Sequence, residues 1–374
     1  MPPQTTSEYG QMSTEDSRFP CDQCGADMRF DPGQDRLICD FCGHVQALSV
    51  DKSARNQAIR ELDYRSAVAN QLPATDMETT RVSHCNNCGA DVEFDGATHA
   101  AECPFCAAPV VTDTGEHRHI KPKALLGFGV DENAARDAMN AWLKRLWFAP
   151  NGLHDYARKG RKMNGIYVPY WTYDADTKTR YSGERGDHYY ETRTVVRDGK
   201  RETERVRRTR WTRTSGRVAR FFDDVLILAS RSLPKKYTDR LKPWDLSQLE
   251  PYSPDYLAGF RAEGYQVQLD EGFVEARDYM DRIIRQDIKR DIGGDEQRIS
   301  QTDTTVSDVT FKHILLPVWL AAYKYRGKTY RFVVNGQTGK VQGERPYSAI
   351  KIAIAVVLGL IVAGGVAYFV SQTQ

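Results

Sequence analysis

Eight cysteines, all in the first 106 residues, form four Cys-x-x-Cys pairs. Within each half of this region the two pairs are separated by 14 residues, so the pattern C-x2-C-x14-C-x2-C occurs twice. This spacing is typical of zinc ribbons, in which two tight turns present four thiolates to one metal ion. The sequence therefore predicts two Zn²⁺ ions, one bound by Cys21, Cys24, Cys39 and Cys42 and the other by Cys85, Cys88, Cys103 and Cys106.

The two cysteine clusters belong to an internal repeat, since the motif Cys-x-x-Cys-Gly-Ala-Asp occurs at 21–27 and again 64 residues later. We predict zinc ribbons at 19–48 and 83–112, joined by a helical linker at 49–82, and each ribbon is too small to fold without its metal. The alternative, a disulfide framework, needs an oxidising compartment and usually an export signal. Residues 1–18, predicted to be disordered, are polar and lack the apolar core of such a signal.

An apolar segment constrains the other end of the sequence. Residues 352–370 contain no charge and would form a helix about 28 Å long, close to the thickness of the hydrocarbon core of a bilayer. We predict one transmembrane helix at 349–370. Arg345 and Lys351 lie on its N-terminal side only, so the positive-inside rule predicts a cell-membrane protein whose N-terminal body is cytoplasmic. Reduced thiolates require the same compartment. Self-association is left open, because small residues permit helix pairing at Ala355, Gly359 and Ala363.

Residues 113–346 are predicted to form an α+β body, mainly of antiparallel strands. Asp131 can cap a helix in which apolar residues recur every three or four positions, and a second helix is predicted at about 271–290. Two apolar runs contain Pro-x-Trp, at Pro169/Trp171 and Pro317/Trp319, and lead into Tyr-rich strands. A duplicated β unit is one interpretation. We interpret its tryptophans and tyrosines as sheet core, with ligand stacking as the alternative.

An arginine-rich hairpin is predicted at 188–214. The Asp-Gly turn at 198–199 sets Thr194 opposite Thr203 and Arg193 opposite Glu204. Residues 191–220 carry eleven Lys and Arg against four Asp and Glu, a net charge of +7. The hairpin either contacts phosphates, of nucleic acid or of lipid headgroups, or is solvated and uses its charged edge against aggregation. The candidate contact residues are Arg193, Arg197, Lys200, Arg201, Arg205, Arg207, Arg208, Arg210 and Arg213.

The net charge of +2 for 374 residues conceals a segregation of charge along the chain. Residues 21–46 carry −3 and residues 85–110 carry −4, whereas residues 324–351, next to the apolar segment, carry +6. Basic residues beside a membrane are attracted to its anionic inner leaflet. This distribution favours a protein partner for the acidic ribbons and lipid for the basic region.

The sequence contains no motif that predicts an enzyme. The hydrolase motif G-x-S-x-G and the zinc-protease motif H-E-x-x-H are absent, and the Gly-Lys-Thr at 327–329 lacks the glycine that a phosphate-binding loop needs five residues earlier. His117 and His119 have no further ligand at metal-binding spacing, so we interpret them as part of a solvated linker.

The doubled ribbons, the run from Leu315-Leu-Pro-Val-Trp319 through Asn335-Gly-Gln-Thr-Gly-Lys340 to Gly343-Glu-Arg-Pro346, and the terminal anchor resemble a family of bacterial membrane-anchored proteins with TFIIB-type double zinc ribbons. Members are often labelled as relatives of the primosomal helicase N′, but this sequence lacks the nucleotide-binding motifs of a helicase. Some members partner phage-shock-type, ESCRT-III-like membrane-remodelling proteins.

The resemblance implies a non-enzymatic membrane adaptor, and we expect ribbons that recruit a cytosolic protein to the inner face of the membrane. The alternative is a membrane-tethered nucleic-acid-binding protein. The expected fold is α+β: two four-cysteine ribbons, then an antiparallel β body with few helices, then one transmembrane helix.

Overall fold

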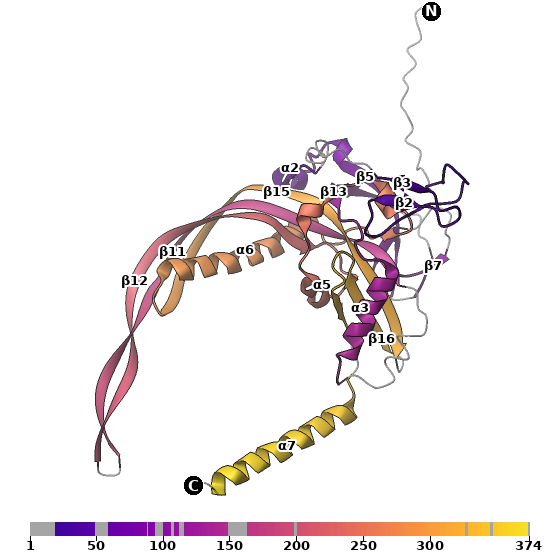
Figure 1. Cartoon of the computed structure of the whole chain (residues 1–374). Coiled ribbons are helices and arrows are strands. Elements are labelled where there is room, and N and C mark those ends of the chain that lie inside the picture. The colour runs from indigo at the N-terminus through magenta and orange to yellow at the C-terminus, as the bar shows by residue number, and fades with distance from the viewer. Residues whose placement is uncertain are drawn as a thin grey trace, which may run out of the picture.

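The computed structural model describes residues 19–48, 59–87, 89–93, 100–105, 108–111, 116–148, 163–197, 200–325, 328–344 and 347–372. The predicted disorder at 1–18 and the predicted ligands Cys88 and Cys106 lie outside these residues. The α+β class is confirmed: a mixed, mainly antiparallel sheet carries few helices, with a cysteine cluster towards the N-terminus and one apolar helix at the other end (Figure 1).

Nine strands among the described residues form the central sheet. Its main path runs through β12 (Lys200–Leu228), β11 (Asn164–Arg197), β15 (Glu296–Tyr325), β10 (Ala124–Leu125) and β13 (Glu250–Pro251). The strands β4 (Leu62–Asp63), β16 (Lys328–Asn335), β17 (Val341–Gly343) and β14 (Arg261–Ala262) pair beside this path.

Three of these strands are far longer than a typical strand of five or six residues and extend out of the body as a curved arm (Figure 1). Pairing of β15 with β11 ends at Glu296 opposite Gly186, whereas β11 and β12 remain paired to Arg197 and Lys200. We call this two-stranded end, residues 187–197 and 200–210, the ribbon tip. The predicted register is confirmed, because Arg193 is opposite Glu204 and Thr194 is opposite Thr203.

Helix α6 (Leu269–Ile292) lies in the concave side of the arm (Figure 1). The predicted helix is confirmed and is two residues longer at each end. Its buried stripe packs on aromatic residues of β11 and β12, among them Trp171, Tyr173 and Phe222. A Cβ atom on Gly272 would lie 2.5 Å from the Tyr173 hydroxyl, so glycine allows the helix to cross the sheet this closely. The buried stripe comprises Leu269, Gly272, Ala276, Met280, Ile284, Ile288 and Ile292.

The two Pro-x-Trp runs lie side by side in antiparallel strands, with Pro169 opposite Leu315 and Tyr167 opposite Pro317. Each indole N–H donates to the carbonyl two residues before a helix: Trp171 to Val267 before α6 at 2.9 Å, and Trp319 to Val130 before α3 (Glu132–Lys144) at 2.7 Å. In the same reciprocal way, β14 pairs parallel with β11 and β10 pairs parallel with β15. An approximate two-fold axis between two copies of one unit would produce this pattern.

All three long strands are irregular at one level of the arm. The pairing of β11 with β12 shifts register between Tyr173 and Ala175, and its pairing with β15 shifts between Asp174 and Asp176. Opposite these shifts, Asp224 and Asp308 have positive φ angles of 50° and 51°, which asparagine and aspartate adopt more readily than most residues. Such bulges increase the local bend and twist of a sheet, so they account for the curvature of the arm.

Shorter elements surround the body. Helix α5 (Lys235–Leu241) and the 3₁₀ turns η2 (Leu246–Gln248) and η3 (Pro254–Leu257) lie between the arm strand β12 and α6 in the chain. Small sheets are formed by β1 (Arg29–Phe30), β2 (Arg36–Ile38) and β3 (Val45–Ala47), by β5 (Met77–His84), β6 (Asp91–Glu93) and β9 (Glu116–Ile120), and by β7 (Ala100–Glu102) with β8 (Pro109–Val111).

Two local predictions differ from the structure. In the described part of the linker at 49–82, the helical segments are the short α2 (Tyr64–Val68) and the 3₁₀ turn η1 (Ala74–Asp76), and strand β5 begins at Met77. The run from Met77 to Val82 contains two threonines and a valine, which suit a strand. The His-x-His pair lies in β9, which pairs with β5, and the His119 ring contacts Tyr265 at 5.1 Å between centroids. The prediction of a solvated linker at His117 and His119 is therefore wrong, because both residues belong to a paired strand.

We expect Ile288→Ala to lower the free energy of unfolding by about 2–5 kcal/mol, because it opens a cavity between α6 and the arm. Val274 lies on the same helix and is 63% exposed, so Val274→Ala should cost much less. Denaturant unfolding of the full chain in detergent, followed by tryptophan fluorescence, measures both. Equal losses for the two variants would contradict the packing of α6 on the sheet.

Candidate metal centre

Two tight turns beside the sheet of β1, β2 and β3 hold the first four cysteines. The N–H of Gly25 donates to the Cys21 carbonyl at 2.7 Å, and the N–H of Gly43 donates to the Cys39 carbonyl at 2.9 Å. Both glycines have left-handed φ angles, +72° and +75°, which a residue with a Cβ atom adopts at a cost. The Cys-x-x-Cys-Gly sequence thus folds locally into a turn that directs two sulfurs to one side.

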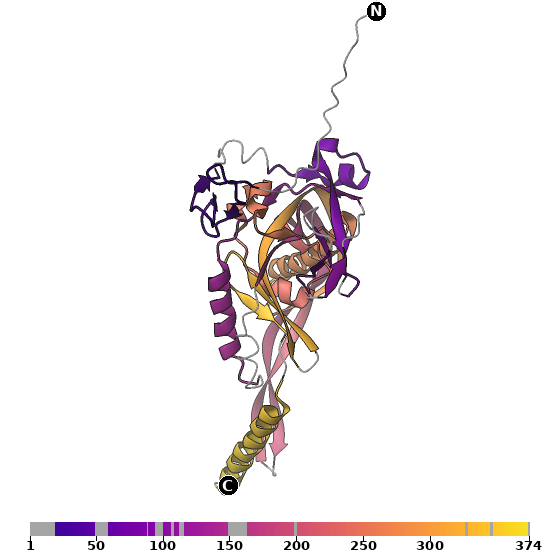
Figure 2. The same ribbon diagram turned by 90° about the vertical axis from the view of Figure 1, so that its right-hand side faces the viewer.

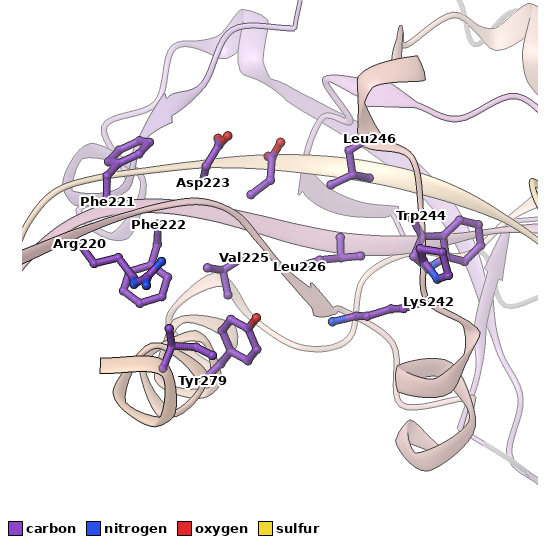
Figure 3. A pocket seen from close by; sticks show the side chains of 13 residues that line it. Arg220, Phe221, Phe222, Asp223, Val225, Leu226, Lys242, Trp244, Leu246 and Tyr279 are labelled. Carbon is purple, nitrogen blue, oxygen red and sulfur yellow. The ribbon is translucent and has the colours of Figure 1, made fainter. Parts of the chain in front are cut away.

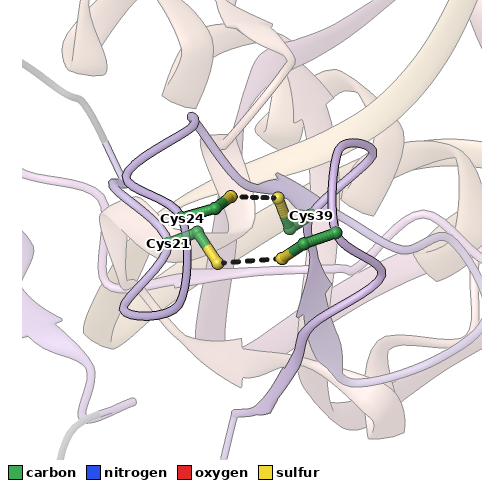
Figure 4. Close-up of side chains that lie close together, drawn as sticks. Cys21, Cys24 and Cys39 are labelled. Carbon is green, nitrogen blue, oxygen red and sulfur yellow. Dashed lines mark hydrogen bonds between the residues drawn. The ribbon is translucent and has the colours of Figure 1, made fainter.

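The four sulfurs form one compact group (Figure 4). Cys21 Sγ lies 3.6 Å from Cys42 Sγ, and Cys24 Sγ lies 3.5 Å from Cys39 Sγ. All four Sγ atoms lie within 4.8 Å of one another. A disulfide would need about 2.05 Å, whereas a tetrahedral ion with metal–sulfur bonds of about 2.3 Å needs sulfurs about 3.8 Å apart. The spacing therefore fits a four-thiolate metal site.

Backbone N–H groups stabilise some of these thiolates. The N–H groups of Cys42 and Phe41 donate to the Cys39 sulfur and, against the cost of burial, lower the pKa of Cys39 to about 7. The N–H of His44 acts on Cys42 in the same sense, but burial and the three neighbouring thiols outweigh it and raise the pKa of Cys42 to about 12. Four thiols this close cannot all ionise unless a cation compensates their charge, and a metal ion could supply that charge.

The second set of cysteines repeats the backbone pattern of the first. The N–H of Cys85 donates to the Ala90 carbonyl at 2.8 Å and that of Cys103 to the Ala108 carbonyl at 2.7 Å, just as the N–H of Cys21 donates to the Ala26 carbonyl at 2.8 Å. The sulfurs of Cys88 and Cys106 lie outside the described residues, so the structure does not define this second group.

The two repeats differ in how their second turn packs. Phe41, between Cys39 and Cys42, is 89% exposed, whereas Phe105, at the equivalent position between Cys103 and Cys106, is 1% exposed. Cys103 and Phe105 belong to the core of the body. One turn is therefore buried against the sheet, while the other presents an aromatic side chain to solvent.

The candidate contact residues of the hairpin all lie on the arm. Arg193 and Arg197 are in β11, and the remaining residues are in β12. The side chains of Arg197 and Lys200 lie outside the described part of the chain. The described arginine side chains of the ribbon tip are exposed, namely Arg193, Arg201, Arg205, Arg207, Arg208 and Arg210, as is Arg213 further along β12.

Helix α7 (Ala349–Gln372) contains a segment long and apolar enough to span a membrane. Within the 22 residues of Ala349–Val370, an 18-residue window has a mean hydropathy of 2.5, and none of that window is buried in the rest of the chain. Both views place α7 at the end of the molecule opposite β2 and the cysteine cluster (Figures 1 and 2).

A second group of possible metal ligands, which the sequence analysis missed, lies where the arm bends. Carboxylate oxygens of Asp174, Asp223 and Asp224 lie within 4.8 Å of one another. Here an ammonium already provides the positive charge: Lys312 Nζ, on the buried side of β15, contacts Asp224 Oδ1 at 2.8 Å and Glu61 Oε1 at 2.9 Å. Burial and the proximity of Glu61 raise the pKa of Asp174 to about 7. The cluster is an internal charge network of the bend.

A groove of about 570 Å³ runs between β12, α6 and the segment at 242–246. Lys242 and Tyr279 extend towards one another across it, and Trp244 closes one end (Figure 3). Arg220, at the other end, is held by Asp287 at 2.6 Å. The described lining is aliphatic and aromatic with a few charged side chains.

Comparison with known proteins finds one similar protein of comparable length. The chain is 26% identical over 337 residues to the uncharacterized protein YdjG of Bacillus subtilis (strain 168). The aligned region covers 90% of this chain and 92% of the relative. No family model matches the chain, and no solved structure matches it.

As pH rises from 5 to 8, we expect the free energy of unfolding to decrease less in Asp174→Asn than in the wild type, with a difference of about 2 kcal/mol. The folded-state pKa of Asp174, about 7, exceeds its usual value, so the wild type is most stable below about pH 4 on this account and loses that stability as pH rises through 7. Asparagine does not titrate. Unfolding measured across this pH range tests the prediction, with Asp303→Asn, an exposed position on β15 outside the cluster, as a control that should follow the wild type.

Proposed function

We propose that the protein is a membrane-anchored zinc-ribbon adaptor without catalytic activity. In this proposal α7 spans the cell membrane and the N-terminal body lies in the cytoplasm, where the ribbons recruit a protein partner. The observation that carries the proposal is the placement of the four-thiol cluster and α7 at opposite ends of the molecule (Figures 1 and 2). An anchor at one end leaves the cysteine site free to meet a cytosolic protein.

We assign Zn²⁺ to the four-thiol cluster and to a second site formed by Cys85, Cys88, Cys103 and Cys106. Four thiolates at tetrahedral spacing are the usual ligand set of structural zinc. The repeated turn geometry at Cys85 and Cys103 supports the second site. Each ion would contribute folding free energy, because small ribbons have little core of their own.

The exposed phenyl ring of Phe41 supports a protein partner for the first ribbon. Aromatic residues, phenylalanine among them, are enriched at protein–protein interfaces relative to the rest of the surface. The acidic surroundings, with a net charge of −3 over residues 21–46, favour a partner with a basic surface. The family resemblance implies a phage-shock-type protein, and hence a part in the response to membrane stress.

The basic region at 324–351, with a net charge of +6, supports a lipid contact beside α7. It also supports the cytoplasmic orientation of the body, since Arg345 and Lys351 would lie on the cytoplasmic side.

Metal analysis of the protein purified in detergent should find two zinc ions per chain. Cys21→Ser with Cys24→Ser should retain one, as should Cys85→Ser with Cys88→Ser, because two thiolates cannot complete a four-coordinate site. His44→Ala serves as the control and should retain both ions, since His44 contributes its backbone N–H rather than its ring. Zinc content that does not change in either cysteine variant would overturn the assignment.

Phe41→Ala should reduce partner capture without loss of zinc. Truncation of an aromatic hot spot costs about 2 kcal/mol, or roughly thirtyfold in affinity. Crosslinking in native membranes, followed by identification of the captured proteins, compares this variant with Phe221→Ala, which removes another exposed phenylalanine, 57% exposed on the arm. An unchanged partner set for Phe41→Ala, with zinc intact, would remove the first ribbon from recruitment.

A further inference from the structure

The strand register divides the charges of the ribbon tip between its two faces. Residues directly opposite in an antiparallel pair share a face, and successive residues alternate between faces. Pairing of Tyr190 with Arg207, Thr192 with Arg205 and Thr194 with Thr203 puts these residues on one face. Pairing of Tyr189 with Arg208, Glu191 with Val206 and Arg193 with Glu204 puts the alternate residues on the other.

One face carries arginines without acids. We call it the arginine face. Among the described side chains of the ribbon tip, it bears Arg201, Arg205 and Arg207 together with Tyr190, Thr192, Thr194 and Thr203. The opposite face, which we call the balanced face, bears Arg193, Arg208 and Arg210 together with Asp187, Glu191 and Glu204. The strand register also puts Arg197, Lys200 and Glu202 on the balanced face, which gives that face a net charge of +1 against +3 for the arginine face. The larger net positive charge of the ribbon tip is therefore on the arginine face, whose arginines have no acid of the ribbon tip beside them.

The side-chain contacts agree with this division. On the balanced face, Arg208 Nε lies 3.4 Å from Glu191 Oε2. On the arginine face, the guanidinium of Arg205 lies 5.0 Å from the ring centroid of Tyr190, whose side chain is 60% exposed. Among the described residues, no ion pair involves Arg201, Arg205 or Arg207. Glu296 of β15 lies at the base of this face, where it accepts a hydrogen bond from Thr209 at 3.1 Å.

A charged edge that only prevents aggregation has no need of this division, because mixed charges on both faces would serve equally well. Three exposed arginines, interleaved with threonine hydroxyls and one tyrosine ring, offer charge and hydrogen-bond donors to an anionic phosphate surface. Eleven residues of extended strand also reach about 36 Å beyond the end of β15. The face can therefore act well away from the body.

The anchor indicates which phosphate surface is available. The ribbon tip and α7 both lie at the end of the molecule opposite the cysteine cluster (Figures 1 and 2). We propose that the arginine face of the ribbon tip binds the anionic lipid headgroups of the membrane that α7 spans. This inference rests on the membrane anchoring proposed above, and it makes the arm a second membrane contact whose strength depends on lipid composition.

The test uses the full chain in lipid nanodiscs, with a photo-crosslinking amino acid introduced at Thr203 on the arginine face or at Val206 on the balanced face. We expect lipid adducts from Thr203 to exceed those from Val206 by about tenfold in nanodiscs that contain anionic lipid, and to fall to the Val206 level in neutral nanodiscs. Combined Arg201→Gln, Arg205→Gln and Arg207→Gln should abolish the excess. The matched control, Arg193→Gln with Arg208→Gln and Arg210→Gln, should retain it.

Equal adducts from the two positions, or an excess that also persists in neutral lipid, would overturn the inference. An added oligonucleotide that is crosslinked at Thr203 in place of lipid would assign the face to nucleic acid instead. Failure of the chain to remain in the nanodisc would refute the anchor itself, so the two proposals fail in different ways. Zinc content and near-UV circular dichroism of the variants show whether they are folded.

Discussion

The antiparallel pairing of β11 with β15 is the interaction on which the rest of the molecule depends. It brings the two Pro-x-Trp runs together, and each indole then holds the start of a helix through one hydrogen bond to a backbone carbonyl. These bonds are exchanged: the strand that follows α3 binds the start of α6, and the strand that follows α6 binds the start of α3. The unit of α3 and β11 and the unit of α6 and β15 therefore depend on each other, because each supplies a paired strand and a tryptophan hydrogen bond to the other.

The length of α6 determines how far the arm remains three strands wide. The helix covers the concave side of the sheet from Leu269 to Ile292, a distance of about 35 Å. It ends at Gly293, whose φ of +66° turns the chain back, and β15 starts at Glu296 and runs towards the body. Beyond that point β11 and β12 have neither a third strand nor a helix, which explains why the ribbon tip carries polar and charged residues on both faces.

Much of this could be predicted from the sequence, for local reasons. Cysteine spacing places four sulfurs together, helical periodicity identifies α3 and α6, and the Asp-Gly turn sets the register that pairs Arg193 with Glu204. The remainder depends on contacts between distant segments. The exposure of Phe41 and the burial of Phe105 arise from packing on the body, although the two repeats match in sequence. Likewise, nothing near Lys312 in the sequence indicates that it meets Glu61, 251 residues away. The linker prediction failed at Met77 because β9, a distant strand, stabilises β5.

The aligned bulges at Asp174, Asp224 and Asp308 have a mechanical consequence. A sheet bends most easily where its hydrogen-bond ladder is interrupted, and at this level all three strands are irregular together. The arm is therefore expected to hinge at this level, where Lys312 forms ion pairs with Glu61 and Asp224. A force on the ribbon tip would therefore act at this level and at the shift of β11 against β15 between Ser182 and Gly183. Movement at the far end of the arm would thus reach the body through the three strands, the packed helix α6 and the charged side chains of this bend.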